Sequence, residues 1–108
     1  FGPEFLMKPE ANLWRTLLAR TDQAGYVATC NAILGTDITE QLSEIAAPAL
    51  VFAGQHDLAT PPNVVAALAA ALPDADLISF ETTGHLPAIE APDALVDALI
   101  NFVKRITP

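Results

Sequence analysis

The stretch ALVFAGQHDLATPP (Ala49–Pro62) joins an uninterrupted apolar segment to a turn that contains an aspartate and two prolines. A short apolar run without polar alternation is typical of a strand that is buried on both faces in a parallel sheet. Asp57 follows three residues after Gly54, where this strand is expected to end. The strand is thus predicted to present a carboxylate at its carboxyl end, and that carboxylate needs a partner.

The residues after this turn predict a second strand-and-helix unit. Three further elements are expected: a helix over 63–73 that is ended by Pro73, a strand over 76–80, and a last helix over 92–106 with Pro92 in its first turn. The order strand, helix, strand, helix indicates a right-handed parallel crossover. The predicted fold class is therefore α/β, with two parallel strands, a crossover and flanking helices.

Helical segments are also predicted ahead of the strands. Apolar residues recur at helical spacing in 12–21 (NLWRTLLART), 23–34 (QAGYVATCNAIL) and 38–45 (ITEQLSEI). Thr21 and Asp22 are candidate caps of the second segment, and Gly35 is expected to end it in a left-handed conformation. The head FGPEFL (1–6) looks like the remainder of a tag-cleavage and cloning site, so it is left out of the predicted fold.

Composition and charge exclude several classes of protein. With 52% hydrophobic and 17% charged residues, the 108-residue chain is expected to be one globular domain. Its net charge of −8 repels nucleic acid and anionic membrane surfaces, and no apolar run is long enough to span a bilayer. A single cysteine, Cys30, and the lack of a signal segment predict a cytoplasmic location.

His85 is predicted to meet Asp57 at one edge of the sheet. The loop TTGHLPAIEAP (82–92) places His85 just beyond the second strand, and functional groups of α/β sheets collect beyond the carboxyl ends of strands. A carboxylate that accepts the Nδ1 proton fixes the tautomer and the ring plane of a catalytic histidine, so we expect the acid and base of a triad. Taken singly, Asp57 could instead cap its own turn, and His85 could be an exposed loop residue.

Together these motifs resemble the carboxyl-terminal third of an α/β-hydrolase. The matching segments are PALVFAGQHDLATPP (48–62) and TTGHLPAIEAPDALVDALINF (82–102). Upstream, TDQAGYVATCNAILGTDITEQLSEI (21–45) is similar to the last cap helix and linker of 3-oxoadipate enol-lactonases. The resemblance implies cap-like helices over 7–36 and a hydrolase subdomain over 37–108. It also implies a small-molecule ester or lactone as the substrate of the intact enzyme, and no cofactor.

The nucleophile of this family has no counterpart in the sequence. It is a serine in a G-x-S-x-G elbow ahead of the acid and the histidine, whereas Ser43 and Ser79 lie in a helical segment and a strand. Cys30 precedes Asp57 and His85, as a cysteine nucleophile would. Its context, YVATCNAIL, lacks elbow glycines and favours a small buried hydrophobe. The family's oxyanion hole also comes from earlier chain, so the 108 residues alone are predicted to be inactive.

Other polar and aromatic side chains have more than one possible role. Trp14 and Tyr26 either line a substrate-binding pocket beneath the cap or pack in the core. His56 is expected to face solvent, and no spaced set of ligands predicts a metal site. Glu90 is expected to fix the loop of His85, by hydrogen bonds to the backbone or to a nearby cation, rather than to act in catalysis.

Two alternatives to a hydrolase portion stay open. The chain could be a non-catalytic truncated domain that folds by self-association, because two parallel strands leave open edges and apolar surface. A homo-oligomer is expected in that case. Alternatively, an amino-terminal half that contains the serine elbow could associate with this chain and supply the nucleophile.

Overall fold

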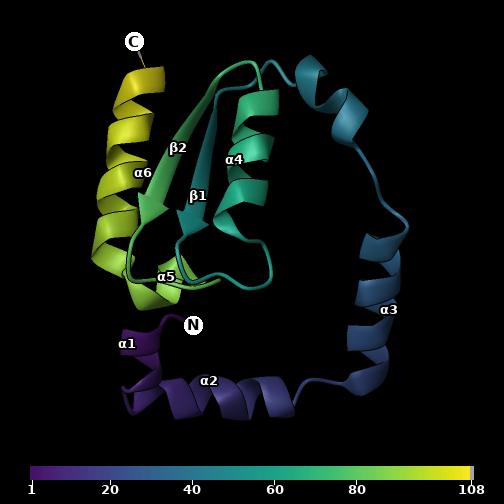
Figure 1. The fold of residues 1–108 in the computed structure, drawn as a ribbon, viewed down its shortest axis with the longest axis vertical. Helices are drawn as coiled ribbons and strands as arrows, with labels where there is room; N and C mark the ends of the chain where they lie inside the picture. The colour runs from purple at the N-terminus through teal and green to yellow at the C-terminus, as the bar shows by residue number, and fades with distance from the viewer. Residues whose placement is uncertain (108) are drawn as a thin grey trace.

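The computed structural model describes residues 1–107, which form a sheet unit and an arm of helices (Figure 1). The sheet unit contains β1 (Ala49–Gly54), α4 (Pro62–Ala71), β2 (Ala75–Phe80), α5 (Pro87–Glu90) and α6 (Pro92–Ile106). Helix α4 connects the two strands and contacts both of them, and α6 lies along β2. The predicted order of strand, helix, strand and helix is thus confirmed.

β1 and β2 pair in parallel, so their carboxyl ends lie at the same edge of the sheet. Ala49 is opposite Ala75, and Gly54 is opposite Phe80. This pairing confirms the predicted fold class. The predicted burial of β1 on both faces is wrong: only Ala53 and Gly54 are buried, because β2 is the only strand that pairs with β1 among residues 1–107.

The arm consists of α1 (Pro3–Leu6), α2 (Glu10–Ala19), α3 (Gln23–Leu34) and the 3-10 helix η1 (Thr39–Glu44). Helix α3 has the predicted bounds, and Asp22 caps it by accepting a hydrogen bond of 2.7 Å from the amide of Gly25. The left-handed conformation predicted for Gly35 is wrong. Its φ of −86° and ψ of 0° are accessible to any residue, so the helix ends without a special glycine.

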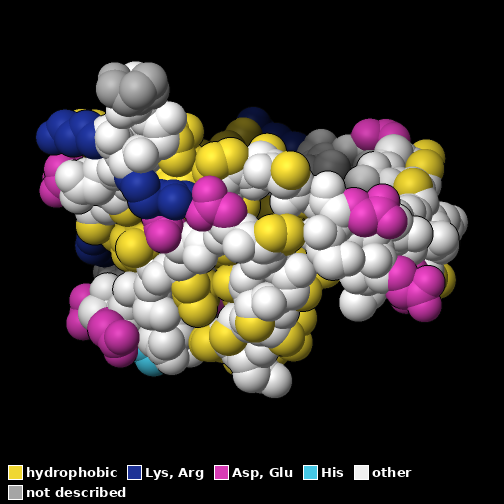
Figure 2. All heavy atoms as spheres, turned by 90° about the horizontal axis from the view of Figure 1, so that it is seen from above, with side chains coloured by type: hydrophobic (Ala, Val, Ile, Leu, Met, Phe, Trp, Pro, Cys, Tyr) yellow, Lys and Arg dark blue, Asp and Glu magenta, His cyan; other side chains and the backbone are white. Residues whose placement is uncertain are grey.

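The arm leaves much apolar surface uncovered. No residue of α3 is buried although this helix is apolar on all sides, and Figure 1 shows it standing away from the sheet. A helix of that kind is normally found inside a protein. Cys30 is exposed on α3, so the expected buried cysteine is wrong for this chain. Figure 2 shows further hydrophobic side chains on the face of the molecule that is seen from above.

The dimensions of the chain reflect this open arrangement. Its accessible surface is 7705 Å² and its radius of gyration is 15.9 Å. A compact monomer of the same size has a surface of about 5,800 Å² and a radius of gyration of about 13 Å. The chain therefore exposes roughly 1,900 Å² more than expected. None of the helices in the described part of the chain has the length and apolar character needed to cross a membrane.

The head, residues 1–6, has a definite place in this fold. It forms α1 next to the carboxyl ends of the strands (Figure 1), and Phe5 is buried there. The amide of Gly2 donates a hydrogen bond of 2.6 Å to Oε2 of Glu90. The predicted fold therefore omitted a segment that contacts the sheet unit. The cloning origin of these residues stays a prediction.

The two strands are held closely together where they end. Val65 and Phe80 are buried there, and the ring centroid of Phe80 lies 5.6 Å from that of Phe52. Gly54 approaches the loop after β2 so closely that a Cβ atom would overlap the carbonyl oxygen of Gly84. Only glycine permits such an approach between two backbones.

Gly54→Ala is expected to lower the free energy of unfolding by about 1–3 kcal/mol, because the added methyl group must displace the backbone of Gly84. Gly35→Ala is the matched control, since a Cβ atom there meets the carbonyl oxygen of Asn31 at an ordinary 3.8 Å. Its stability should stay unchanged or rise by about 0.4–1 kcal/mol. Urea unfolding measures both variants, and a Gly54→Ala protein as stable as its parent would contradict the close approach.

Candidate active site

Asp57 lies in the turn after β1 and is held by that turn. Its Oδ1 accepts hydrogen bonds from the amides of Ala59 (2.8 Å) and Thr60 (3.0 Å). Its Oδ2 accepts one from the hydroxyl of Thr60 (2.7 Å). The residue is only 7% exposed. Asp57 therefore does cap its own turn, and Oδ2 can still accept a bond from a second partner.

That second partner is His85, as predicted. Nδ1 of His85 lies 2.8 Å from Oδ2 of Asp57. An ionised carboxylate only accepts hydrogen bonds, so Nδ1 carries the proton and Nε2 is left as the basic nitrogen. The side chain of His85 is 53% exposed, which leaves the ring accessible. The predicted contact is confirmed, and the catalytic role of the pair stays a proposal.

The environment of Asp57 keeps its carboxylate charged. Burial alone raises the pKa of the carboxyl group, because removal from water penalises the charged form. Hydrogen bonds from the side chains of His85 and Thr60, and then from the amides of Thr60 and Ala59, outweigh burial and hold the pKa of Asp57 well below its usual range. The site therefore holds a buried carboxylate that remains an acceptor at neutral pH.

Thr60 also belongs to this site, although it was not predicted from the sequence. Its hydroxyl bonds to Asp57 and lies 3.4 Å from Nδ1 of His85. The available signal was the threonine three residues after Asp57, a spacing typical of side chains that cap turns. Thr60 thus adds a hydroxyl donor to the two amide donors that stabilise the ionised carboxylate.

Glu90 fixes the loop that contains His85. Its carboxylate accepts bonds from the amide of Gly84 (3.0 Å to Oε1 and 2.9 Å to Oε2) and from that of Leu86 (3.2 Å to Oε1). A further amide, that of Gly2, bonds to Oε2. The predicted loop-fixing role is confirmed, and all the partners are backbone amides. The short helix α5, which ends at Glu90, was not predicted.

The loops that contain Asp57 and His85 also bond to each other. The amide of His56 donates a hydrogen bond of 2.9 Å to the carbonyl oxygen of Thr83. The side chain of His56 is exposed, as expected. This bond extends the β1–β2 pairing beyond the strands, so it sets the separation at which the acid and the histidine meet. The hydroxyl of Thr83 is buried and has no partner among residues 1–107.

A hollow of about 350 Å³ opens beside His85, between the carboxyl end of β1 and helix α5. Leu86 borders this hollow and also a second, largely apolar one on the inner side of α2. Trp14 lines the second hollow and is 37% exposed. Trp14 thus lies at a surface hollow of this chain and not in its core, and its role in substrate binding stays a proposal.

Tyr26 lines the continuation of the same surface. Leu18 and Thr21 border both the hollow of Trp14 and the one that contains Tyr26. The side chain of Tyr26 is 54% exposed, so the core alternative is wrong for this residue too. Three adjoining hollows thus extend from His85 along the inner face of the arm.

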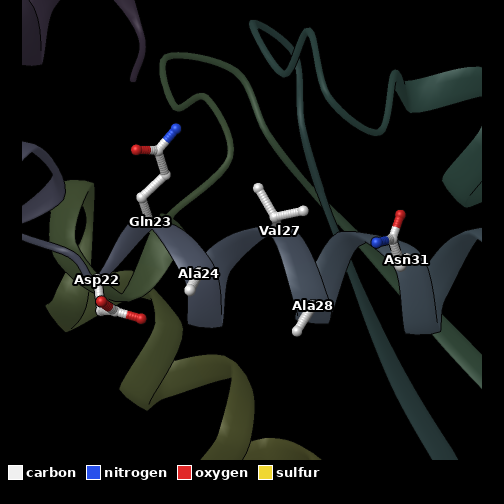
Figure 3. A pocket seen from close by; sticks show the side chains of 6 residues that line it. All are labelled: Asp22, Gln23, Ala24, Val27, Ala28 and Asn31. Atoms are coloured by element: carbon white, nitrogen blue, oxygen red, sulfur yellow. The ribbon is translucent and has the colours of Figure 1, made fainter.

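A separate shallow hollow along α3 contains no reactive group (Figure 3). Its lining consists of Asp22, Gln23, Ala24, Val27, Ala28 and Asn31. Figure 3 shows Gln23 and Val27 on one side of the helix and Ala28 on the other, so these side chains do not converge. The carboxylate of Asp22 is already engaged by the amide of Gly25. This hollow is therefore not a candidate for catalysis.

No nucleophile bonds to His85 within residues 1–107. Ser43 lies in η1, Ser79 in β2 and Cys30 in α3, so none occupies a tight turn beside the imidazole. The same residues offer no group of three or more His, Cys, Asp or Glu side chains that could hold a metal ion. What the arrangement can do is orient a histidine to accept a proton and to return it.

Stability at acid pH should depend on Asp57. Because the pKa of Asp57 is lowered by folding, its contribution is present above the unfolded value of about 3.9 and is lost as pH falls towards the folded value. Between pH 5 and pH 2, the free energy of unfolding of the parent should therefore fall by roughly 1–3 kcal/mol more than that of Asp57→Asn. Urea unfolding across this range measures the difference. Asp97→Asn, at an exposed position of α6, is the control, and its free energy of unfolding should change with pH as that of the parent does. The prediction would be refuted if Asp57→Asn and the parent lost the same stability between pH 5 and pH 2.

Comparison with known sequences identifies the relatives of this chain. The α/β-hydrolase family model Abhydrolase_4, described as TAP-like protein, matches residues 17–105. A pimeloyl-[acyl-carrier protein] methyl ester esterase of Xanthomonas campestris is 35% identical over 97 residues. That match covers 88% of this chain and 38% of the esterase. The match to the family model includes both Asp57 and His85.

Solved structures agree with this assignment. A hydrolase from Pseudomonas aeruginosa has a TM-score of 0.86 at 29% identity, over 95% of this chain and 40% of that protein. The enol-lactonase from Burkholderia xenovorans has a TM-score of 0.85 at 30% identity, over 94% of this chain and 40% of the enzyme. The chain thus spans about two fifths of the length of these relatives and matches their carboxyl-terminal portion. It belongs to the α/β-hydrolase family.

Proposed function

We propose that this chain supplies the acid and the base of an ester- or lactone-cleaving triad. The observation behind the proposal is the 2.8 Å bond between Nδ1 of His85 and Oδ2 of Asp57, beside an open hollow. A histidine held in this way is a general base for a hydroxyl nucleophile. In this proposal the serine and the oxyanion hole come from an amino-terminal portion, because relatives of this chain are about two and a half times as long.

The proposed reaction uses each of the two residues in one role. Nε2 of His85 accepts the proton of the serine hydroxyl while the serine oxygen bonds to the carbonyl carbon of the ester. The imidazolium then gives this proton to the leaving alcohol oxygen as the carbon–oxygen bond breaks. In the second half, His85 takes a proton from water as the water oxygen bonds to the acyl carbon, and gives it to the serine oxygen as the acyl–serine bond breaks and the carboxylic acid leaves. Asp57 stays ionised throughout and stabilises the imidazolium.

The substrate we infer is a small-molecule ester or lactone. The relatives include an enol-lactonase and a methyl ester esterase, both of which act on a carboxylic ester bond. The resemblance of residues 21–45 to enol-lactonases favours an enol-lactone, and we propose that residues 7–36 act as the cap over the site. Trp14 and Tyr26 would then bind the substrate, because their hollows adjoin that of His85.

The exposed apolar surface of the arm also favours association with another chain. A stable interface removes about 800 Å² from each partner, and this chain exposes roughly 1,900 Å² more than a compact monomer does. We therefore propose that the chain pairs with the amino-terminal portion of a hydrolase or, in its absence, forms a homo-oligomer. In the non-catalytic alternative, the chain self-associates and takes part in no catalysis.

The purified chain alone is expected not to hydrolyse an enol-lactone or an activated ester, because residues 1–107 place no nucleophile beside His85. Activity should appear on mixing with an amino-terminal hydrolase fragment that contains a G-x-S-x-G serine. His85→Ala should reduce that activity by about 10²–10⁴-fold. His56→Ala is the matched control, since His56 neighbours Asp57 in sequence but its side chain is exposed, and it should change the rate less than twofold.

The outcomes of this experiment separate the proposals. Turnover by the chain alone that disappears in His85→Ala would mean that an unrecognised nucleophile is present, and Cys30→Ser would test the first suspect. A mixture in which the two chains bind but stay inactive would contradict the catalytic proposal, whereas a chain that only self-associates would support the non-catalytic alternative. Activity that is equally sensitive to His56→Ala and His85→Ala would contradict the assignment of the base.

In the absence of a partner, the chain at micromolar concentration is expected to elute as a dimer or larger species. The physical reason is the exposed apolar arm, whose helix α3 has no buried residue. Size-exclusion chromatography with light scattering gives the mass directly. A stable monomer of 11.4 kDa that keeps its helical signal would count against self-association.

A further inference from the structure

Glu90 places its carboxylate beneath the loop that presents His85. It accepts bonds from the amides of Gly84 and Leu86, the residues on each side of the histidine. Both carboxylate oxygens take part, because the amide of Gly84 lies 3.0 Å from Oε1 and 2.9 Å from Oε2. The backbone that determines the direction of the His85 side chain is thus fixed on both sides by one carboxylate.

This backbone restraint matters because little else restrains the imidazole. The side chain of His85 is 53% exposed, so neighbouring residues cover less than half of it. Within residues 1–107, its shortest side-chain hydrogen bond is to Oδ2 of Asp57. A catalytic group must be held within about half an ångström of its productive position, which requires support from surrounding residues. The bonds of Glu90 provide that support through the backbone before and after His85.

The head of the chain completes the same cluster. The amide of Gly2 bonds to Oε2 of Glu90 at 2.6 Å. A Cβ atom on Gly84 would lie only 2.7 Å from the carbonyl carbon of Phe1, and one on Gly2 would overlap the carbonyl oxygen of Thr82. Residues 1 and 2 therefore pack directly against the backbone of the histidine loop, and the amides of Gly2 and Gly84 both bond to Glu90.

We propose that Glu90 is a positioning residue for His85, and that its carboxylate ties the head of the chain and the histidine loop into one unit. This inference rests on the proposed function, because it assigns Glu90 a role only through His85. The carboxylate of Glu90 accepts hydrogen bonds from backbone amides, so we assign it a structural role and not a role in proton transfer. Its effect is to keep Nδ1 of His85 in line with Asp57.

Glu90→Gln is the informative substitution. It keeps the length and shape of the side chain, but its NH₂ group replaces one acceptor oxygen and would face an amide donor. Glu81→Gln is the matched control, since Glu81 lies in the same connection after β2, is exposed, and has no hydrogen bond among residues 1–107. Should Glu90→Gln fail to fold, Glu90→Asp keeps the charge while withdrawing the carboxylate by one methylene group.

The experiment is NMR spectroscopy of the full chain, with urea unfolding to verify the fold of each variant. Nitrogen chemical shifts of the imidazole report which tautomer the neutral His85 adopts. In the parent we expect the Nδ1–H tautomer, since Asp57 accepts that proton. Glu90→Gln should shift the population towards Nε2–H and raise amide exchange at Gly84 and Leu86 by roughly tenfold. Glu81→Gln should match the parent in both measurements.

The possible outcomes are distinct. Faster amide exchange in Glu90→Gln or Glu90→Asp with an unchanged tautomer of His85 would overturn the proposal, because Glu90 would then stabilise the loop without positioning the ring. A parent in which neutral His85 is mainly the Nε2–H tautomer would contradict the proposed function itself, and the role of Glu90 would fall with it. A tautomer shift in the Glu90 variants alone supports the proposal.

Discussion

The close approach of Gly54 to Gly84 is the constraint on which the site depends. Parallel pairing brings the ends of β1 and β2 to one edge of the sheet, but pairing alone leaves two independent loops there. Because neither glycine has a side chain, the backbones can approach further, and the amide of His56 can bond to the carbonyl oxygen of Thr83. The 2.8 Å contact between Asp57 and His85 follows from this separation.

The carboxylates of Asp57 and Glu90 stabilise different parts of the site. Asp57 is buried, and its charge is maintained by donors from its own turn and from His85. Among residues 1–107, the hydrogen-bond partners of the Glu90 carboxylate are backbone amides, two of them in the histidine loop. In a chain with a net charge of −8, these two acids are held by hydrogen bonds rather than by lysine or arginine. Hydrogen bonds to backbone amides have fixed directions, which suits a site whose geometry must be reproducible.

The part of the fold that depends on short-range patterns was predictable from sequence. The apolar run of β1, the bounds of α3 and α6, and the meeting of Asp57 with His85 all follow from periodicity, helix ends and parallel topology. The misses have physical causes. Cys30, Trp14 and Tyr26 are residue types that are common at buried positions, and only the three-dimensional arrangement shows that they are exposed here. The bond between Gly2 and Glu90 links residues 88 positions apart, which no local pattern reports.

The hydrogen bonds of Asp57 make the acid less dependent on the histidine than the histidine is on the acid. Three of its hydrogen bonds come from Ala59 and Thr60, within its own turn, and only one comes from the loop after β2. The carboxylate therefore has its hydrogen bonds to Ala59 and Thr60 whether or not His85 contacts it. His85 has no such local support and depends on Asp57 and on its loop. The acid is thus the fixed reference of the pair, and the position of the histidine is set by a loop that must keep its close contact with Gly54 at the end of β1.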